Sequence, residues 1–412
     1  MLDGFRILDL TWVLGGPFAG QLLAQLGADV IKVEPPAGDM ARATEPVFFE
    51  GDSSFFLSVN RGKRGVALDL KSAAGREVLH DLVRASDAVI YGFAPDVPPR
   101  LGLDHASLLE VNPRICLGQL IGLHDEGEYA SKPAFDLVVQ ALGGVMSITG
   151  EPGGRPVRVG YQIADLAGGL YLALGVLGAL LQAGRTGAGR AVQISLLDCQ
   201  LALLTWQAQN YLINREVPAA NGSRHHMIAP SEAFTGSDGR SFVVSPTGER
   251  FWAAFCEAAG RPDLAADPRF ATAGDRIANV DALAGELGRM FAERPAHEWV
   301  ERLDRARVPA APVLGVDQAL HQAVAGLRSM VEAVPTPGGG SLDFLGNPFR
   351  TDGGKPALPY PPRLGEHTAS VLREVCGYDD ARIDDLAARG VVARAPDGSK
   401  EPDGSKEGKG NP

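Results

Sequence analysis

Asp165 stands directly before the longest apolar run of the chain, which covers residues 166–181. A run of this length predicts a buried helix, so the sequence puts a carboxylate at the start of that helix. Such a carboxylate can cap the helix, because its oxygens accept unpaired backbone N–H groups and its charge meets the positive end of the helix dipole. It can also act as a nucleophile on an acyl group. Caps are far more common, and only the surrounding residues can decide between the two interpretations.

A second candidate site is the segment of residues 10–20, in which Gly15 and Gly16 follow an expected strand. The next strand ends at Glu34, which imitates the acidic ribose ligand of a dinucleotide site. The spacing differs from G-x-G-x-x-G, however, and Pro17 follows the glycine pair. The segment therefore favours a tight strand-to-helix turn over a nicotinamide site.

Basic residues gather around an expected strand at residues 65–70 and on later loops. They could bind the phosphates of a cofactor if the fold brings them together, although lysine and arginine are usually only solvated. The sequence leaves both interpretations open. The set comprises Arg61, Lys63, Arg64, Lys71, Arg100 and Lys132.

No metal site is expected. His225 and His226 are adjacent, so their side chains point in different directions, and no further ligands follow at a recognisable spacing. The sequence also lacks the G-x-S-x-G elbow of a serine nucleophile.

The candidate residues lie in a chain that alternates strands and helices. Short β-branched runs alternate with helical patterns over the first 120 residues, which predicts βαβ units on a doubly wound parallel sheet, an α/β fold. The expected strands cover residues 5–10, 30–33, 65–70, 88–91, 115–120 and 191–194. The expected helices cover residues 18–26, 73–85, 105–111, 166–181 and 196–212.

A second, smaller domain is expected because 412 residues exceed the size at which a single core stops growing. Residues 217–223 are rich in Pro, Ala, Asn and Gly and mark a linker. Residues 233–245 then predict a hairpin, and the amphipathic helices that follow suit a small α+β domain. The sequence ends with PDGSKE repeated twice, so residues 394–412 are expected to be a disordered tail.

Composition narrows the function classes. The formal charge is -11, which argues against general binding to nucleic acids or membranes. The apolar run after Asp165 is short for a membrane span and contains several glycines, so a closely packed core helix fits better. No secretory signal is evident, and a cytoplasmic protein is expected. The scattered cysteines form no CxxC pair and suit a reducing compartment; they are Cys116, Cys199, Cys256 and Cys376.

Several segments together resemble the class III CoA-transferase family, which includes formyl-CoA transferase, carnitine CoA-transferase and the α-methylacyl-CoA racemases. The resemblance covers nearly the whole chain except the tail. It rests on LDLTWVLGGPFAGQLLAQLGADVIKVEPPAGD (8–39), NRGKRGVALDLK (60–71), RLGLD (100–104), KPAFDLVVQALGG (132–144), GYQIADLAGGLYLALGVLGAL (160–180), TGAGRAVQISLLD (186–198), DPRFATAGDRIAN (267–279) and VPAAPV (308–313).

The resemblance implies that Asp165 is the catalytic nucleophile, since this Asp opens the IADLAGG-like helix of the family. It would attack an acyl-CoA thioester and form an aspartyl-CoA thioester, from which CoA passes to an acceptor acid. The helix start would keep the carboxylate ionised. The family's racemases carry His where this chain has Phe135, and Phe135 cannot move a proton, so the resemblance favours a transferase.

The resemblance also implies a CoA site formed by Val13, Leu68, Leu70, Lys71, Arg100 and Lys132, with no permanently bound cofactor and no metal. The chain departs from formyl-CoA transferase at Leu14, Pro35 and Gly92, which argues against formate and oxalate as substrates. Leu14 and Trp12 suggest a less polar acyl pocket. The glycine-rich loop over the family's site is matched by residues 221–223.

The architecture implied by the resemblance is an interlocked homodimer. In each chain, residues 1–216 begin a large Rossmann-like domain, 217–310 form the small domain, and 311–393 return to complete the large one. Two alternatives remain beside the transferase: an α-methylacyl-CoA racemase, and a non-catalytic CoA-binding protein that does not need Asp165.

Overall fold

The computed structural model describes residues 1–395 apart from residues 45, 131 and 355, and these form two compact units. The first unit comprises Met1–Gly143, Tyr161–Leu204 and the chain from Val331 onward, and the second comprises Gly144–Gly160 and Thr205–Met330. The PDGSKE repeats lie outside the described residues. The domain division expected at 216/217 and 310/311 stays a prediction.

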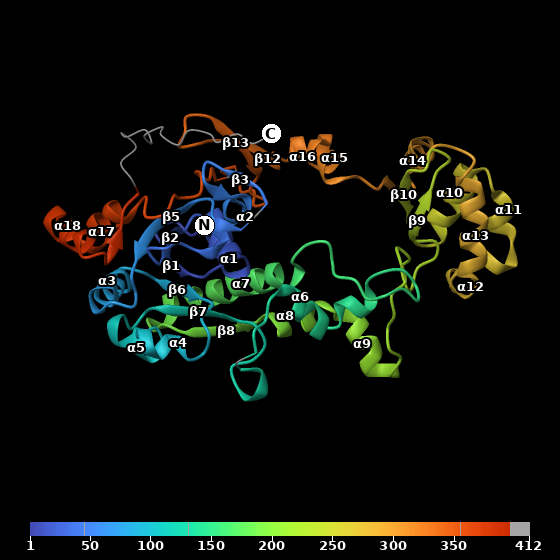
Figure 1. The fold of residues 1–412 in the computed structure, drawn as a ribbon. Coiled ribbons are helices and arrows are strands. Elements are labelled where there is room, and N and C mark those ends of the chain that lie inside the picture. Colours follow the sequence, from blue (N-terminus) through green and yellow to red (C-terminus); the bar gives the residue numbers. More distant parts are fainter. Residues whose placement is uncertain (45, 131, 355, 396–412) are drawn as a thin grey trace, which may run out of the picture. The chain divides into compact units, whose positions relative to one another are not determined.

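A seven-stranded sheet forms the centre of the first unit, in the order β14-β5-β2-β1-β6-β7-β8 (Figure 1). Six strands are parallel, and β14 pairs antiparallel with β5. The strand order changes direction between β1 and β6, which is the point where doubly wound folds bind ligands. The strands are β1 (Arg6–Leu10), β2 (Asp29–Glu34), β5 (Lys63–Leu68), β6 (Ala88–Tyr91), β7 (Cys116–Ile121), β8 (Ala191–Ser195) and β14 (Val392–Ala393). The parallel α/β sheet expected from the sequence is confirmed.

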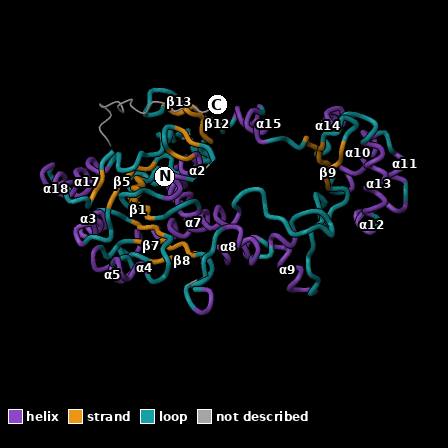
Figure 2. The backbone as a smooth tube through the Cα atoms, viewed as in Figure 1, coloured by secondary structure: helices purple, strands orange, loops and turns teal. Residues whose placement is uncertain are grey.

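Helices cover both faces of this sheet (Figure 2). Because successive strand residues point to opposite faces, Ile7 and Leu8 of β1 enter different cores. The Ile7 core includes α1 (Gly15–Gln25) and α7 (Ile163–Thr186). The Leu8 core is closed by α3 (Ala73–Arg84), α5 (His105–Val111), α17 (Thr368–Cys376) and α18 (Asp380–Ala388).

Helix α7 is longer than the sequence indicates and packs on α1 and on strands β7 and β8. By length and composition alone it could cross a membrane, but 50% of its apolar window is buried inside the unit. Core helices of soluble proteins meet the same criteria, so this is weak evidence for a span.

The single helix expected over residues 196–212 is wrong. The segment forms two helices, α8 (Leu196–Leu203) and α9 (Thr205–Asn214), because Thr205 adopts a φ of 42° and breaks the helical path. The second segment of the first unit ends at this break. Further short elements of the first unit are α2 (Ser54–Ser58), α4 (Val97–Leu101), α6 (Asp136–Leu142), and the hairpins of β3 (Phe48–Phe49) with β4 (Asp52–Ser53) and of β12 (Val331–Pro335) with β13 (Ser341–Leu345).

The second unit contains a three-stranded antiparallel sheet in the order β11-β10-β9. Strands β9 (Glu232–Thr235) and β10 (Ser241–Val244) form the expected hairpin, and β11 (Ala310–Pro312) adds the third strand. The core joins Phe242, Phe255, Phe291 and Trp299 in a run of ring contacts. Its main helices are α10 (Glu249–Ala259), α13 (Val280–Phe291) and α14 (Ala296–Arg305).

Candidate active site

Asp165 lies in the first turn of α7, two residues after the helix begins at Ile163. The N-cap residue is Gln162, so the expectation that Asp165 caps this helix is wrong. The side chain is partly buried. Among the residues that the structure describes, no hydrogen bond or ion pair engages its carboxylate. An ionisable group in this state is available for chemistry rather than committed to structure.

The carboxylate that caps α7 belongs to Asp136, the first residue of α6. Its Oδ1 atom accepts the backbone N–H groups of Ala164 at 2.9 Å and of Asp165 at 3.5 Å. Its Oδ2 atom accepts a hydrogen bond from Nε2 of Gln140 at 2.6 Å. Asp136 is buried, and both of its carboxylate oxygens accept hydrogen bonds. The sequence analysis missed its role, although Asp136 directly follows Phe135 in the KPAFD segment.

The pKa of Asp165 is raised to about 7, first by burial and second by the negative charge of Asp136. Both effects disfavour the ionised carboxylate. The dipole of α7 acts in the opposite direction but does not overcome them. The expectation that the helix start keeps Asp165 fully ionised is therefore wrong, and the group titrates near neutral pH.

The β1–α1 loop lies against the first turns of α7, and glycines make the approach possible. A Cβ atom on Gly15 would lie 2.8 Å from the backbone oxygen of Asp165, and one on Gly169 would lie 2.5 Å from the oxygen of Gly15. Within the described part of the chain, the amides of Leu14, Gly15 and Gly16 donate no hydrogen bond. Unpaired amides at the start of a helix beside Asp165 can stabilise a negatively charged oxygen.

A cavity of about 850 Å³ opens at the carboxyl ends of β1, β2 and β5. Four residues predicted to contact CoA line it together: Leu68, Leu70, Lys71 and Arg100. Trp12 and Phe93 add aromatic surface. A cavity with apolar walls and several cations suits an organic molecule that carries phosphates.

Arg76, in the first turns of α3, is a further cation of this cavity that was not predicted from the sequence. Its Nη1 atom donates to the backbone oxygen of Lys71 at 2.9 Å. No carboxylate of the described residues pairs with Lys71 or Arg76, whereas Arg100 contacts Asp96 at 2.9 Å on the surface. Arg76 has no sequence signal of its own, since it looks like an ordinary cation on a helix surface.

Val13 and Lys132 do not line this cavity. Val13 lies in the β1–α1 loop next to Trp12 and has a φ of 69°, which is unfavourable for a β-branched residue. Lys132 is exposed, with its Nζ atom 5.3 Å from the centre of the Tyr129 ring. The structure therefore brings four of the six predicted CoA contacts to one cavity.

Three of the basic residues singled out in the sequence have structural partners instead. Lys63 is fully buried, with Nζ 2.8 Å from Oδ2 of Asp9, and Arg61 donates to the oxygens of Leu345 and Leu358 at 2.8 and 2.9 Å. Arg64 pairs with Asp29 at 2.6 Å. These side chains stabilise the sheet and its edges and do not line the cavity.

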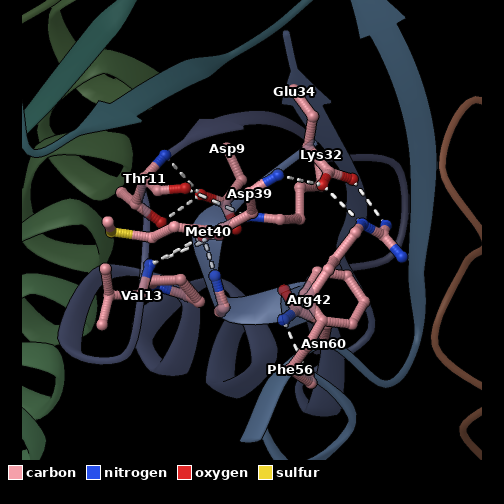
Figure 3. Close-up of polar contacts among 12 residues, drawn as sticks. Asp9, Thr11, Val13, Lys32, Glu34, Asp39, Met40, Arg42, Phe56 and Asn60 are labelled. Carbon is pink, nitrogen blue, oxygen red and sulfur yellow. Dashed lines mark hydrogen bonds and ion pairs between the residues drawn. The ribbon is translucent and has the colours of Figure 1, made fainter. Parts of the chain in front are cut away.

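Lys63 and Asp9 belong to a buried charge cluster next to the β1–α1 loop, and Figure 3 shows Asp9, Lys32 and Asp39 of this cluster. In the same cluster Lys32 pairs with Asp39 at 3.0 Å. At its edge Arg42 contacts Glu34 at 2.7 Å and Asp52 at 2.8 Å. Every charge in this cluster therefore has an opposite partner within hydrogen-bond distance.

The described residues contain no group of three or more His, Cys, Asp or Glu side chains arranged to hold a metal. His225 and His226 lie in the second unit, each with its ring centre 5.9 Å from that of Trp206. The Nδ1 atom of His225 also accepts a hydrogen bond from the backbone N–H of Met227 at 3.1 Å.

Phe135 precedes Asp136 as the N-cap residue of α6, and its side chain is 68% exposed. It has no group that could exchange a proton with a substrate. The position next to the Asp136 cap is therefore apolar in this chain.

Comparison with known proteins agrees with this geometry. The model of CoA-transferase family III matches residues 2–368. The chain is 36% identical over 377 residues to an acetyl-CoA:oxalate CoA-transferase of Acetobacter aceti, covering 90% of this chain and 95% of that protein. It is 34% identical over 397 residues to a succinyl-CoA:glutarate CoA-transferase of Mus musculus, covering 95% and 90%.

Among solved structures, a CAIB/BAIF family protein from Brucella suis superposes with a TM-score of 0.81 at 34% identity, covering 91% of this chain and 99% of that one. The sequence matches and the structural match each cover about 90% or more of this chain and of the protein compared with it. The chain therefore belongs to CoA-transferase family III and is an enzyme of that family.

Proposed function

We propose that the enzyme transfers CoA from an acyl-CoA donor to a carboxylic acid through a covalent intermediate on Asp165. The observation that carries this proposal is the state of the Asp165 carboxylate. It is partly buried, has no partner among the described side chains, and belongs to a residue whose backbone contacts Gly15, at the start of a helix with unpaired amides. A nucleophile needs this combination of a free carboxylate and oxyanion donors.

The first half of the reaction loads the enzyme with CoA. An oxygen of ionised Asp165 attacks the thioester carbonyl, the C–S bond breaks, and CoA leaves as a thiolate, which yields a mixed anhydride between Asp165 and the donor acid. The thiolate then attacks the aspartyl carbonyl, which forms an aspartyl-CoA thioester and releases the donor acid as a carboxylate. Each tetrahedral intermediate carries one negative oxygen for the loop amides to stabilise.

The second half reverses these steps with the acceptor. Its carboxylate attacks the aspartyl-CoA carbonyl, CoA thiolate leaves, and a second mixed anhydride forms. The thiolate attacks the acyl carbon of that anhydride, which yields the new acyl-CoA and regenerates ionised Asp165. No redox cofactor or metal is needed to balance either half.

CoA would bind in the cavity at the carboxyl ends of β1, β2 and β5, with Lys71 and Arg100 near its phosphates and Leu68 and Leu70 against its apolar parts. Val13 would contact CoA from the β1–α1 loop. We further propose that Lys132 joins this site when substrate is bound, since in the free enzyme it is exposed.

The donor and acceptor would be small carboxylic acids. Relatives at 32–36% identity are named for transfer to oxalate, glutarate or mesaconate. In this chain Leu14, Trp12 and Phe135 would give the acyl pocket a less polar surface than formate or oxalate requires.

A homodimer in the cytoplasm would complete the site. The surface of α7 favours the presence of a second copy, because Leu170, Leu174 and Leu181 are 48%, 63% and 69% exposed along it. Apolar residues at this spacing form a stripe that normally packs on another element.

The test is to mix the enzyme with succinyl-CoA or acetyl-CoA and a panel of acids, and to detect new CoA esters. Hydroxylamine added with acyl-CoA should convert Asp165 to a hydroxamate that mass spectrometry can locate. Asp165→Asn should abolish both ester exchange and hydroxamate formation. Undiminished exchange in this variant would exclude Asp165 as the nucleophile.

The α-methylacyl-CoA racemase is the alternative from the same family, and Phe135 argues against it because the position has no proton-exchanging group. Epimerisation of a chiral 2-methylacyl-CoA without any ester exchange would favour the racemase. CoA binding without either reaction would leave only a non-catalytic CoA-binding protein.

A further inference from the structure

Buried charges form hydrogen bonds to the backbone of the β1–α1 loop (Figure 3). Nζ of Lys32 donates to the backbone oxygen of Thr11 at 3.0 Å. The carboxylate of Asp39 accepts the N–H of Val13, with both oxygens at 3.3 Å. The two members of one ion pair therefore hold the loop on either side of Trp12.

This ion pair is sealed from water. The side chains of Lys32 and Asp39 are 0% and 1% exposed, with 3.0 Å between Nζ and Oδ2. Asp39 also accepts the N–H of Ala41 at 2.9 Å, and its own N–H donates to Glu34 at 3.0 Å. Two buried charges with this many fixed partners form a rigid point of attachment.

The loop needs such an attachment because Val13 has a left-handed backbone. Its φ of 69° crowds the branched side chain against its own backbone, and such residues persist only where the surroundings impose them. The hydrogen bond from Val13 N–H to Asp39 fixes the amide that this φ orients. Without it, the residue would relax toward an extended conformation.

A displacement at Thr11 or Val13 would reach the nucleophile through direct contacts. A Cβ atom on Gly16 would lie 2.3 Å from Cβ of Thr11, so the start of α1 rests on the Thr11 side chain. The next contact is between Gly15 and the backbone oxygen of Asp165, where a Cβ would have only 2.8 Å. Loop, helix start and nucleophile therefore move together.

We infer that the Lys32–Asp39 ion pair is a positioning element, which holds Val13 in its left-handed conformation and thereby sets the amides of Leu14, Gly15 and Gly16 beside Asp165. This inference rests on the proposed role of Asp165. Neither Lys32 nor Asp39 reacts with substrate. Their effect is exerted through the loop backbone.

The test compares the Asp39→Asn variant with double variants that also carry a substitution at Val13. Asp39→Asn should lower kcat per titrated active site by about tenfold to a hundredfold, the loss expected when catalytic groups shift by a fraction of an ångström to an ångström. The KM for acyl-CoA should change little. Adding Val13→Gly should recover at least a severalfold part of kcat, because glycine adopts positive φ without strain.

The matched control is Val13→Ala in the Asp39→Asn background. Alanine removes the same side-chain contacts as glycine but still disfavours positive φ, so it should not restore kcat. Asp29→Asn, at the other end of β2, removes a partly exposed partner of Arg6 and Arg64 and should leave kcat unchanged. Equal recovery by alanine and glycine, or an unchanged kcat in Asp39→Asn, would overturn the inference.

A charge-balanced variant, Lys32→Met with Asp39→Asn, repeats the comparison if the single variant does not fold, because it leaves neither partner buried alone. Hydrogen exchange of peptides covering residues 8–16 gives a readout that does not depend on chemistry at Asp165. Exchange should rise in Asp39→Asn relative to the native enzyme and to Asp29→Asn. Unaltered exchange refutes the positioning role, whereas activity without Asp165 refutes only the proposed nucleophile.

Discussion

The Oδ1 atom of Asp136 accepts the backbone N–H of Asp165 at 3.5 Å, so one carboxylate caps the helix turn that carries the other. The two carboxylates have different roles. Asp136 is buried and bonded, whereas Asp165 is free and has its pKa raised to about 7.

Transferase activity should rise with pH. Asp165 must be ionised to attack, and with a pKa of about 7 only about a tenth of it is ionised at pH 6. The rate of hydroxamate formation with acyl-CoA should therefore increase about tenfold from pH 6 to a plateau above pH 8. A flat profile over this range would contradict the raised pKa.

Asp136→Asn should shift this profile to lower pH. Asparagine keeps a side-chain oxygen for the amides of Ala164 and Asp165 but removes the negative charge that disfavours ionisation of Asp165. The midpoint should fall without reaching that of an exposed aspartate, because burial is the larger cause of the raised pKa. Asp136→Ala is the comparison, and loss of the cap should cost about 1 kcal/mol of unfolding free energy.

Asp165→Asn should stabilise the protein above neutral pH. A carboxyl whose folded pKa is raised binds a proton in the folded state that the unfolded state has lost, so stability falls as pH rises from about 4 to 7. Asparagine avoids that loss, and the variant should gain about 1–3 kcal/mol in denaturant unfolding at pH 8, a gain that disappears near pH 4. The substitution of an exposed aspartate, Asp317→Asn, is the control for the loss of a surface charge.

Two glycines of α7 should respond oppositely to alanine. A Cβ on Gly169 would lie 2.5 Å from the backbone oxygen of Gly15, so Gly169→Ala should separate α1 from α7 and lower both stability and kcat. Gly178 has no atom within 4 Å of a Cβ, and Gly178→Ala should stabilise the helix by about 0.5–1 kcal/mol. Thermal unfolding and steady-state kinetics of both variants check this.

Removing a cavity cation should weaken substrate binding selectively. Arg100→Gln should raise the KM for acyl-CoA by about tenfold or more, the usual loss for a charge-assisted phosphate contact, and leave kcat nearly unchanged. Arg64→Gln is the matched control, because Arg64 pairs with Asp29 and does not line the cavity. Equal effects of the two substitutions on KM would contradict the assignment of the cavity.

The sequence predicted the parallel sheet well, because each strand is a local β-branched run whose alternate residues, such as Ile7 and Leu8, fill two cores. It mispredicted the start of α7, since the residue that caps this helix, Asp136, comes from 28 positions before Ala164. No local signal distinguishes Lys63 from Lys71 either. Lys63 is buried where its Nζ atom meets Asp9, a residue 54 positions away in the sequence.

The cavity lined by several cations and the break at Thr205 illustrate the same limit. Lys71, Arg76 and Arg100 reach one cavity because the carboxyl ends of parallel strands converge, a relation that depends on topology and not on spacing. The helix pattern of residues 196–212 is continuous in composition, but the backbone of Thr205 turns out of it. The packing of the complete fold determines both the lining of the cavity and the position of the helix break.

Strand β14 covers one edge of the seven-stranded sheet. Val392 and Ala393 pair with Leu68 and Ala67, so the last described strand shields the hydrogen-bonding groups of β5 from other chains. These residues lie beyond the segment that matches the family, which ends at residue 368. A chain shortened to that segment would keep Asp165 and the cavity residues, but β5 would become an unpaired, apolar edge strand. Self-association through this edge would limit the solubility of the shortened chain.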